Sequence, residues 1–180
     1  MPYAMGKNYT RTFARMKELT GFNFDDEYNS KKYRVFINHP FTPSGFSCYP
    51  DVIGWAAEDR WPNYTTVYLW HELMHHNVEF CRECFQGRRN DEAWRRLNHA
   101  VIQLLTDSEL RVCFNGGSYH PWEGHPNLHK TMELLLPEWR KYLTSENKNI
   151  YAFVDRMEGL FYDKIVEFIN QEKSSVATKG

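Results

Sequence analysis

Residues 64–80 read Y-T-T-V-Y-L-W-H-E-L-M-H-H-N-V-E-F, and this stretch decides which fold the sequence predicts. Pro62 and Asn63, just before it, are typical of a helix start. Apolar side chains then recur at helical spacing on one side, namely Leu69, Trp70, Leu73, Met74 and Phe80. We therefore predict a helix from about residue 63 to residue 80, buried along much of its surface.

Residues 71–75 of this helix form the pattern H-E-x-x-H. Residues four apart lie on one face of a helix about one turn apart, so the imidazoles of His71 and His75 can bind one ion. Glu72 is rotated by about 100° from His71, which places its carboxylate beside the ion, where it can accept a proton from a water. Buried imidazoles and a buried carboxylate are costly without partners, and a zinc ion is the partner that we expect.

The elements around this helix predict short strands before it and helices after it. We expect a helix at 9–20, strands at 31–38 and 51–57, helices at 91–114, from about 128 and at 150–171, an irregular stretch at 118–127 and an interruption near Pro137. Without internal repeats or linkers, residues 1–180 are predicted to form one domain, with residues 173–180 as a disordered tail.

Composition excludes several classes of protein. The 22 Lys and Arg against 23 Asp and Glu give a net charge of −1, so no broad basic surface is available for nucleic acid or an acidic membrane. The chain shows no signal peptide and no apolar run long enough to span a bilayer, which predicts a cytoplasmic protein. Its cysteines, at 48, 81, 84 and 113, are therefore expected to be reduced thiols.

The strands at 31–57 followed by H-E-L-M-H resemble the zincin metallopeptidases. This resemblance implies an α+β fold in which a small twisted sheet precedes the active-site helix and further helices follow it. In such enzymes the two histidines hold one zinc, the glutamate is the general base, and an edge strand binds the substrate. Carried over to this chain, these roles would fall to His71, His75 and Glu72.

A catalytic zinc site needs a third protein ligand. The metzincin spacing would require a glycine at 78 and a histidine at 81, where this chain has Val78 and Cys81. Gluzincins take an acidic residue from a second helix, and Glu109 lies at the edge of the apolar stripe of the helix at 91–114. Asp107 lies farther round that helix and has Arg111 at i+4, which suffices as its partner.

The other candidate for the third ligand is His125. Residues 124–143, G-H-P-N-L-H-K-T-M-E-L-L-L-P-E-W-R-K-Y-L, resemble the last part of SprT-like and WLM-type zincins, where a histidine after a short loop is the ligand. Leu128 comes three residues after His125, whereas the pattern places its apolar residue four after the histidine. In addition, 50 residues separate His75 from His125. His125 and Glu109 therefore remain equal candidates.

These features predict a zinc-dependent peptidase, with a peptide or protein as substrate and Glu72 as general base. Groups expected around the reacting carbonyl are Tyr119, His120, His129 and Arg111. Two alternatives remain: an inactive, zinc-containing binding or regulatory protein, and a metal-dependent hydrolase associated with nucleic acid. The second rests on four arginines at 88, 89, 95 and 96, and the presence of Glu72 favours peptide hydrolysis over it.

Overall fold

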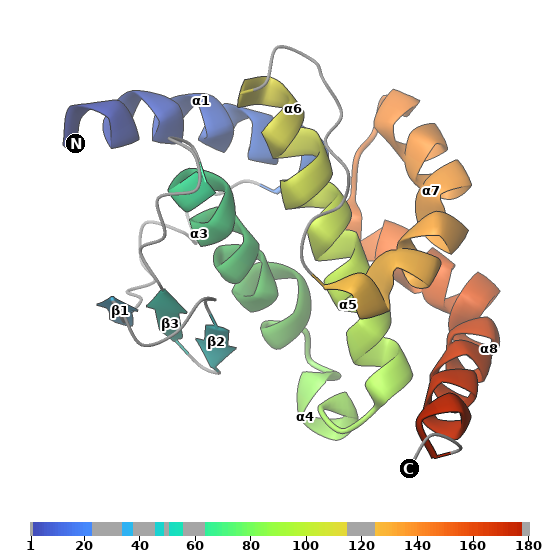
Figure 1. Ribbon diagram of the computed structural model, residues 1–180. Helices are drawn as coiled ribbons and strands as arrows, with labels where there is room; N and C mark the ends of the chain where they lie inside the picture. Colours follow the sequence, from blue (N-terminus) through green and yellow to red (C-terminus); the bar gives the residue numbers. More distant parts are fainter. Residues whose placement is uncertain are drawn as a thin grey trace.

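The computed structural model describes residues 2–22, 34–37, 46–48, 51–55, 64–114 and 125–177. Most of these residues are helical (Figure 1). The α-helices are α1 (Pro2–Thr20), α3 (Tyr64–Met74), α4 (Phe85–Arg88), α5 (Glu92–Gln103), α6 (Arg111–Phe114), α7 (His129–Thr144) and α8 (Ile150–Ala177). Two π-helical segments, η1 (His75–Phe80) and η2 (Leu104–Leu110), and a 3₁₀ turn, η3 (Pro126–Leu128), join them.

Two composite helical runs form the centre of the molecule, and both were predicted correctly as continuous helical stretches. One run is α3 continued by η1, and the other is α5 continued by η2 and α6. The second run begins at Asp91, whose carboxylate accepts a hydrogen bond from the backbone N–H of Trp94 at 2.9 Å. This cap satisfies one of the free N–H groups at the helix start, which explains why the run begins there.

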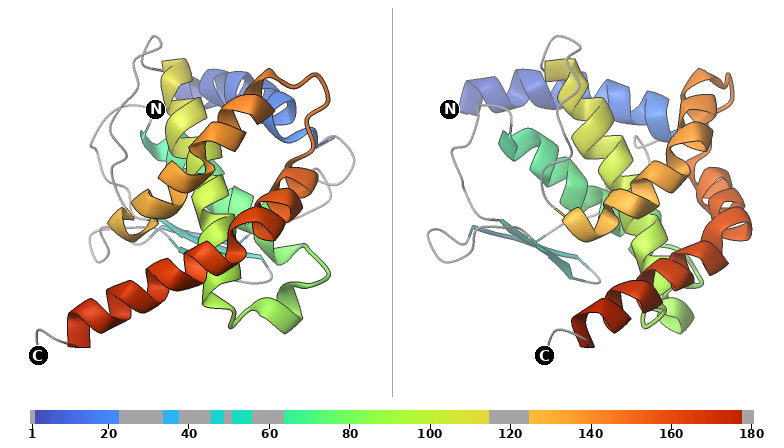
Figure 2. Two further views of the ribbon diagram at one scale, coloured as in Figure 1. Left: turned by 90° about the vertical axis from the view of Figure 1, so that its right-hand side faces the viewer. Right: turned by 45° about the vertical axis from the view of Figure 1, so that its right-hand side comes forward.

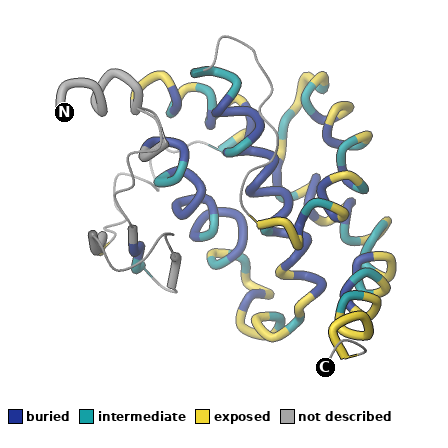
Figure 3. The backbone as a smooth tube through the Cα atoms, viewed as in Figure 1, coloured by how far each residue is buried: buried dark blue, intermediate teal, exposed yellow. Residues whose placement is uncertain are grey.

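The core lies between these helices and is built by helix-on-helix packing. Helix α5 packs against α7 and α8, while α3 packs against η2 and α1. The runs α3–η1 and α5–η2 are buried over most of their length (Figure 3). The largest fully buried side chains include three tryptophans, Trp70, Trp94 and Trp139. Burial of such large apolar side chains is the main stabilising contribution in a molecule of this size.

The strands β1 (Arg34–Ile37), β2 (Phe46–Cys48) and β3 (Val52–Trp55) form a small sheet at one side of the molecule, next to α3 (Figures 1 and 2). Their order is β1-β3-β2, with β1 parallel and β2 antiparallel to β3. His76 links this sheet to η1, because its Nε2 donates a hydrogen bond to the carbonyl oxygen of Val52 at 3.2 Å. The strand β2 was not predicted.

The predicted fold class, an α+β zincin-like fold with a sheet, is wrong. The described residues are mostly helical, and each strand is only three or four residues long. Helices α5, α7 and α8 pack against one another and supply most of the core residues, so the sheet contributes little to the core. The fold therefore lends no support to the resemblance on which the α+β prediction was based.

Other expectations for the helices need smaller corrections. Helix α1 begins at Pro2 instead of residue 9, and α7 continues through Pro137 without interruption. Helix α8 extends to Ala177 and thus includes most of the segment predicted as a tail. Within the described part of the chain, every helix is too short or too polar to cross a lipid bilayer.

Candidate metal centre

Two imidazoles of the H-E-x-x-H motif lie next to each other at the junction of α3 and η1. His71 is in the last turn of α3 and His75 is the first residue of η1. Their ring centroids are 5.1 Å apart. The helical spacing therefore brings the two rings together on one face, as the sequence predicts.

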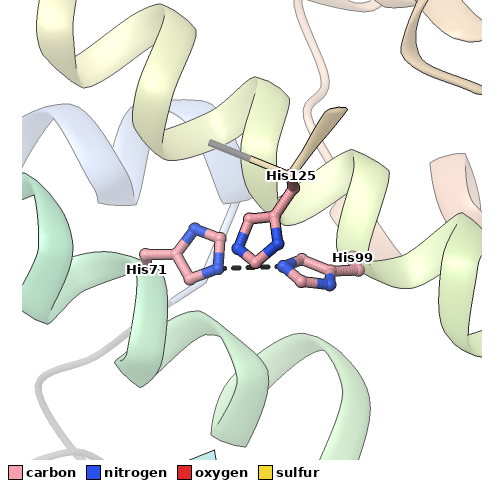
Figure 4. A group of neighbouring side chains, drawn as sticks. All are labelled: His71, His99 and His125. Atoms are coloured by element: carbon pink, nitrogen blue, oxygen red, sulfur yellow. Dashed lines mark hydrogen bonds between the residues drawn. The ribbon is translucent and has the colours of Figure 1, made fainter. Parts of the chain in front are cut away.

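Two further imidazoles join this pair from other parts of the chain. His99 comes from α5, and His125 precedes η3. The Nε2 atoms of His71 and His99 are 3.1 Å apart, and one nitrogen from each of His71, His99 and His125 lies within 4.8 Å of the others (Figure 4). The ring of His75 is 4.7 Å from that of His99. We call these four residues the histidine cluster.

The distance between two of these nitrogens is close to that expected around a tetrahedral metal ion. Zinc binds imidazole nitrogen at about 2.0–2.1 Å, so two ligands of a tetrahedral site lie about 3.3 Å apart. The Nε2 atoms of His71 and His99 nearly meet this value. Imidazole is a ligand that zinc, copper, iron and nickel all accept, and a nearly all-imidazole set without thiolates is typical of catalytic zinc.

Carboxylates orient the two motif imidazoles. The Nδ1 atom of His75 donates to Glu79 Oε2 at 2.8 Å, and the carboxylate of Glu79 is only 2% exposed. The Nδ1 atom of His71 lies 3.3 Å from Asp107 Oδ2 and 3.3 Å from the hydroxyl of Thr106. A proton on Nδ1 leaves the lone pair on Nε2, which is the form of imidazole that binds a metal.

The pKa values within the cluster are shifted in opposite directions. Burial alone lowers the pKa of His71, but the hydrogen bond and charge of Asp107, together with the charge of Glu72, outweigh it and raise that pKa. Burial lowers the pKa of His99, and the nearby His71, His75 and Arg95 lower it further. Burial and the neighbouring His71 likewise lower the pKa of His125. His99 and His125 are therefore held neutral, with a lone pair free for a metal.

Glu72 lies beside the cluster in a buried position. Its exposed fraction is 4%, and its negative charge acts on both His71 and His125. A buried carboxylate this near to several imidazoles is suited to exchange a proton with a group held by them.

The acidic candidates for the third ligand lie in different environments. Glu109 has one carboxylate oxygen 3.3 Å from Arg15 and the other 3.4 Å from the indole nitrogen of Trp139. Asp107, in contrast, contacts His71 and so orients an imidazole. Of the two third-ligand candidates that the sequence left equal, the structure brings His125 into the histidine cluster and gives Glu109 other partners.

The residues expected around a reacting carbonyl are only partly described. Arg111 is buried in α6, and His129 is the first residue of α7, four positions after His125. Tyr119 and His120 lie outside the described residues.

The backbone at His125 adopts a conformation that non-glycine residues rarely use. Its φ of 27° and ψ of 56° lie in the left-handed region. Such a residue costs about 1–3 kcal/mol and persists only where its surroundings impose it. Histidine is among the residues that tolerate this region better than most.

Sequence reasoning missed two residues of the site, His99 and Glu79. His99 lies on the same helix face as Glu92, Arg95 and Arg96, a pattern typical of a solvated surface. Glu79 stands four residues after His75, so the i,i+4 rule that paired the two histidines could also have paired His75 with Glu79.

Comparison of the chain with protein-family models, curated proteins and solved structures finds no match.

Proposed function

We propose that this protein is a zinc-dependent peptidase whose metal is held by the histidine cluster. The observation that carries the proposal is the convergence of nitrogens from His71, His99 and His125 beside the buried carboxylate of Glu72. Three imidazole ligands with an adjacent carboxylate are one of the sets that can support metal-assisted hydrolysis. When bound, zinc would polarise a peptide carbonyl and acidify a water.

The residues of this chain then divide the remaining tasks. Glu72 would take the proton of the attacking water and pass it to the departing amine. Asp107 and Glu79 would keep His71 and His75 in the tautomer whose Nε2 binds the metal. With His71, two of the three other imidazoles of the cluster would complete a set of three ligands and leave the fourth position for water.

The decisive test replaces the proposed base. Glu72→Gln should leave zinc content and helical content unchanged, because the amide has nearly the same shape, and should lower kcat for peptide hydrolysis by at least about 10²-fold. Zinc is measured by elemental analysis, and hydrolysis by mass spectrometry of peptide mixtures. Glu133→Gln, at an exposed position of α7, is the matched control. Full activity in Glu72→Gln would refute the proposed mechanism.

One observation favours a second candidate function, a protein whose zinc is structural. Four imidazoles could occupy all four positions of a tetrahedral ion and leave none for water. Alanine variants of His75, His99 and His125 distinguish the two. A catalytic site with three ligands should keep its zinc in one of these variants, whereas a closed four-ligand site should be weakened in all three and should hydrolyse no peptide.

A further inference from the structure

A pocket of about 420 Å³ opens beside the histidine cluster. His75 and His99 lie on its wall, so the pocket borders the histidine cluster. Its lining also contains the cations Arg89, Arg95 and Arg96, the acids Glu79 and Glu92, and the neutral residues Asn90, Asn127 and Leu128. The volume is within the range of pockets that bind small ligands or single side chains.

Three of the charged residues in this lining already have partners. Glu79 is buried and accepts the hydrogen bond of His75. Arg96 is only 7% exposed and binds both carboxylate oxygens of Glu172, at 2.6 and 3.2 Å. Glu92 is paired with Lys173 at 2.6 Å. Glu172 and Lys173 thus offset the charges of Arg96 and Glu92, which leaves little of either charge for a ligand.

The two remaining cations of the lining, Arg89 and Arg95, have N–H donors available for a ligand. Arg95 is 60% exposed, and its ion pair with Glu79 is long, at 3.5 Å. Arg89 is exposed, and its side chain forms no ion pair or hydrogen bond with the described residues. A guanidinium carries five N–H donors in a planar fork that matches a carboxylate. The amides of Asn90 and Asn127 add neutral donors.

We propose that this pocket is a subsite for a carboxylate of the substrate, either an acidic side chain or the carboxyl terminus of a peptide. The inference rests on the proposed peptidase function, since it assigns a substrate class to the same site. Leu128 is the one apolar residue among the described residues of the lining, so a hydrophobic side chain would find little to pack against. A cationic side chain would be repelled by Arg89 and Arg95.

Binding and cleavage are measured with three probe peptides. These are acetyl-Ala-Ala-Glu-Ala-Ala-amide, its Gln counterpart, and acetyl-Ala-Ala-Gln-Ala-Ala with a free carboxyl terminus. Binding is measured by calorimetry with the zinc-loaded Glu72→Gln protein, which needs no catalysis. One of the two carboxylate peptides should bind about tenfold more tightly than the amidated Gln peptide, and which one does so identifies the source of the carboxylate.

Arg89 provides the matched variants. Arg89→Glu, made in the same Glu72→Gln protein, should abolish the tenfold preference, while Arg140→Gln, at an exposed arginine of α7, should preserve it. Equal binding of all three peptides, or a preference unaffected by Arg89→Glu, would overturn the subsite. A carboxylate preference in binding without any cleavage by the wild-type protein would instead refute the peptidase function and leave the subsite standing.

Discussion

The two helical runs that meet at the histidine cluster hold their imidazoles in different ways. The run α3–η1 supplies His71 and His75, and each of these imidazoles has a carboxylate at its Nδ1 atom. The run α5–η2 supplies His99, whose pKa is lowered by burial and by the positive charges around it. One run thus orients its ligands through hydrogen bonds, whereas the other keeps its ligand neutral through its surroundings. A metal site can be prepared by either route.

The largest effect should come from removing one ligand from each run. His71→Ala and His99→Ala should each lower zinc content to less than a tenth of one ion per chain, because each removes an imidazole nitrogen from the converging set. Elemental analysis of the purified variants gives the measurement. Glu109→Ala, on the same run as His99, is the control and should keep its zinc. Retention of zinc in His99→Ala would leave α5 without a role in the site.

Core substitutions test whether both runs are equally anchored. Met74 in α3 and Leu105 in η2 are fully buried. Met74→Ala and Leu105→Ala should each lower the free energy of unfolding by about 2–5 kcal/mol, as buried aliphatic truncations do. Denaturation in urea of the metal-free proteins is the measurement, with Leu160→Ala, at a 55% exposed position, as a control with little effect. A loss below about 1 kcal/mol at one site would show that this run contributes less to the core.

Removing the charge of each orienting carboxylate sharpens the comparison within the site. Glu79→Gln and Asp107→Asn should each weaken zinc binding by about 10- to 100-fold, the usual cost of losing a partner of a metal-bound imidazole. The larger loss is expected for Glu79, whose hydrogen bond is shorter and whose carboxylate is more buried. Competition with a zinc chelator measures the affinity. Glu167→Gln on the exposed side of α8 should change nothing, and equal affinity in all three variants would rule out the orienting role.

Lowering the pH should change the contributions of His99 and His71 to the free energy of unfolding in opposite directions. The lowered pKa of His99 means that, below about pH 6.5, the unfolded chain takes up a proton that the folded chain does not. Relative to His99→Gln, the metal-free wild type should then lose up to about 1.4 kcal/mol of stability for each pH unit below 6.5. The raised pKa of His71 has the opposite consequence, because its stabilisation is fully present below 6.5 and is lost as the pH rises through the folded pKa.

This pH dependence is measured by urea denaturation of the wild type, His99→Gln and His71→Gln between pH 7.5 and pH 5.5. Toward acid, the wild type should lose stability relative to His99→Gln and gain it relative to His71→Gln. Slopes of the same sign for both variants would contradict the difference between the two runs.

Sequence reasoning predicted the helices well because their apolar periodicity is local. The runs at 64–80 and 92–114 need only residues three or four apart, and so do the neighbours His71 and His75. His99 could not be found this way, since its place in the site depends on how α5 packs against η1. The sequence also did not show how little the sheet contributes to the fold. The alternation of side chains in β1 and β3 does not reveal how many strands pair with them.

The assignment of carboxylates shows the same limit. Asp107 has Arg111 one helical turn ahead, and a local rule sufficed to make that pair. The structure places Asp107 against His71, a residue 36 positions earlier. A rule that considers only neighbours in the sequence cannot predict a partner from another helix. It is therefore least useful for the polar residues of a buried site.

The π-helical segments make the number of residues as important as their identity. A π turn holds one residue more than an α turn, and η1 begins at His75 itself. Deleting one residue between 75 and 79 would remove the extra residue and let this segment rewind as an α-helix whose far end points nearly the same way. The spacing between His75 and Glu79 would change, however, so the deletion should break the hydrogen bond between these two side chains while leaving the path of the chain after η1 nearly unchanged.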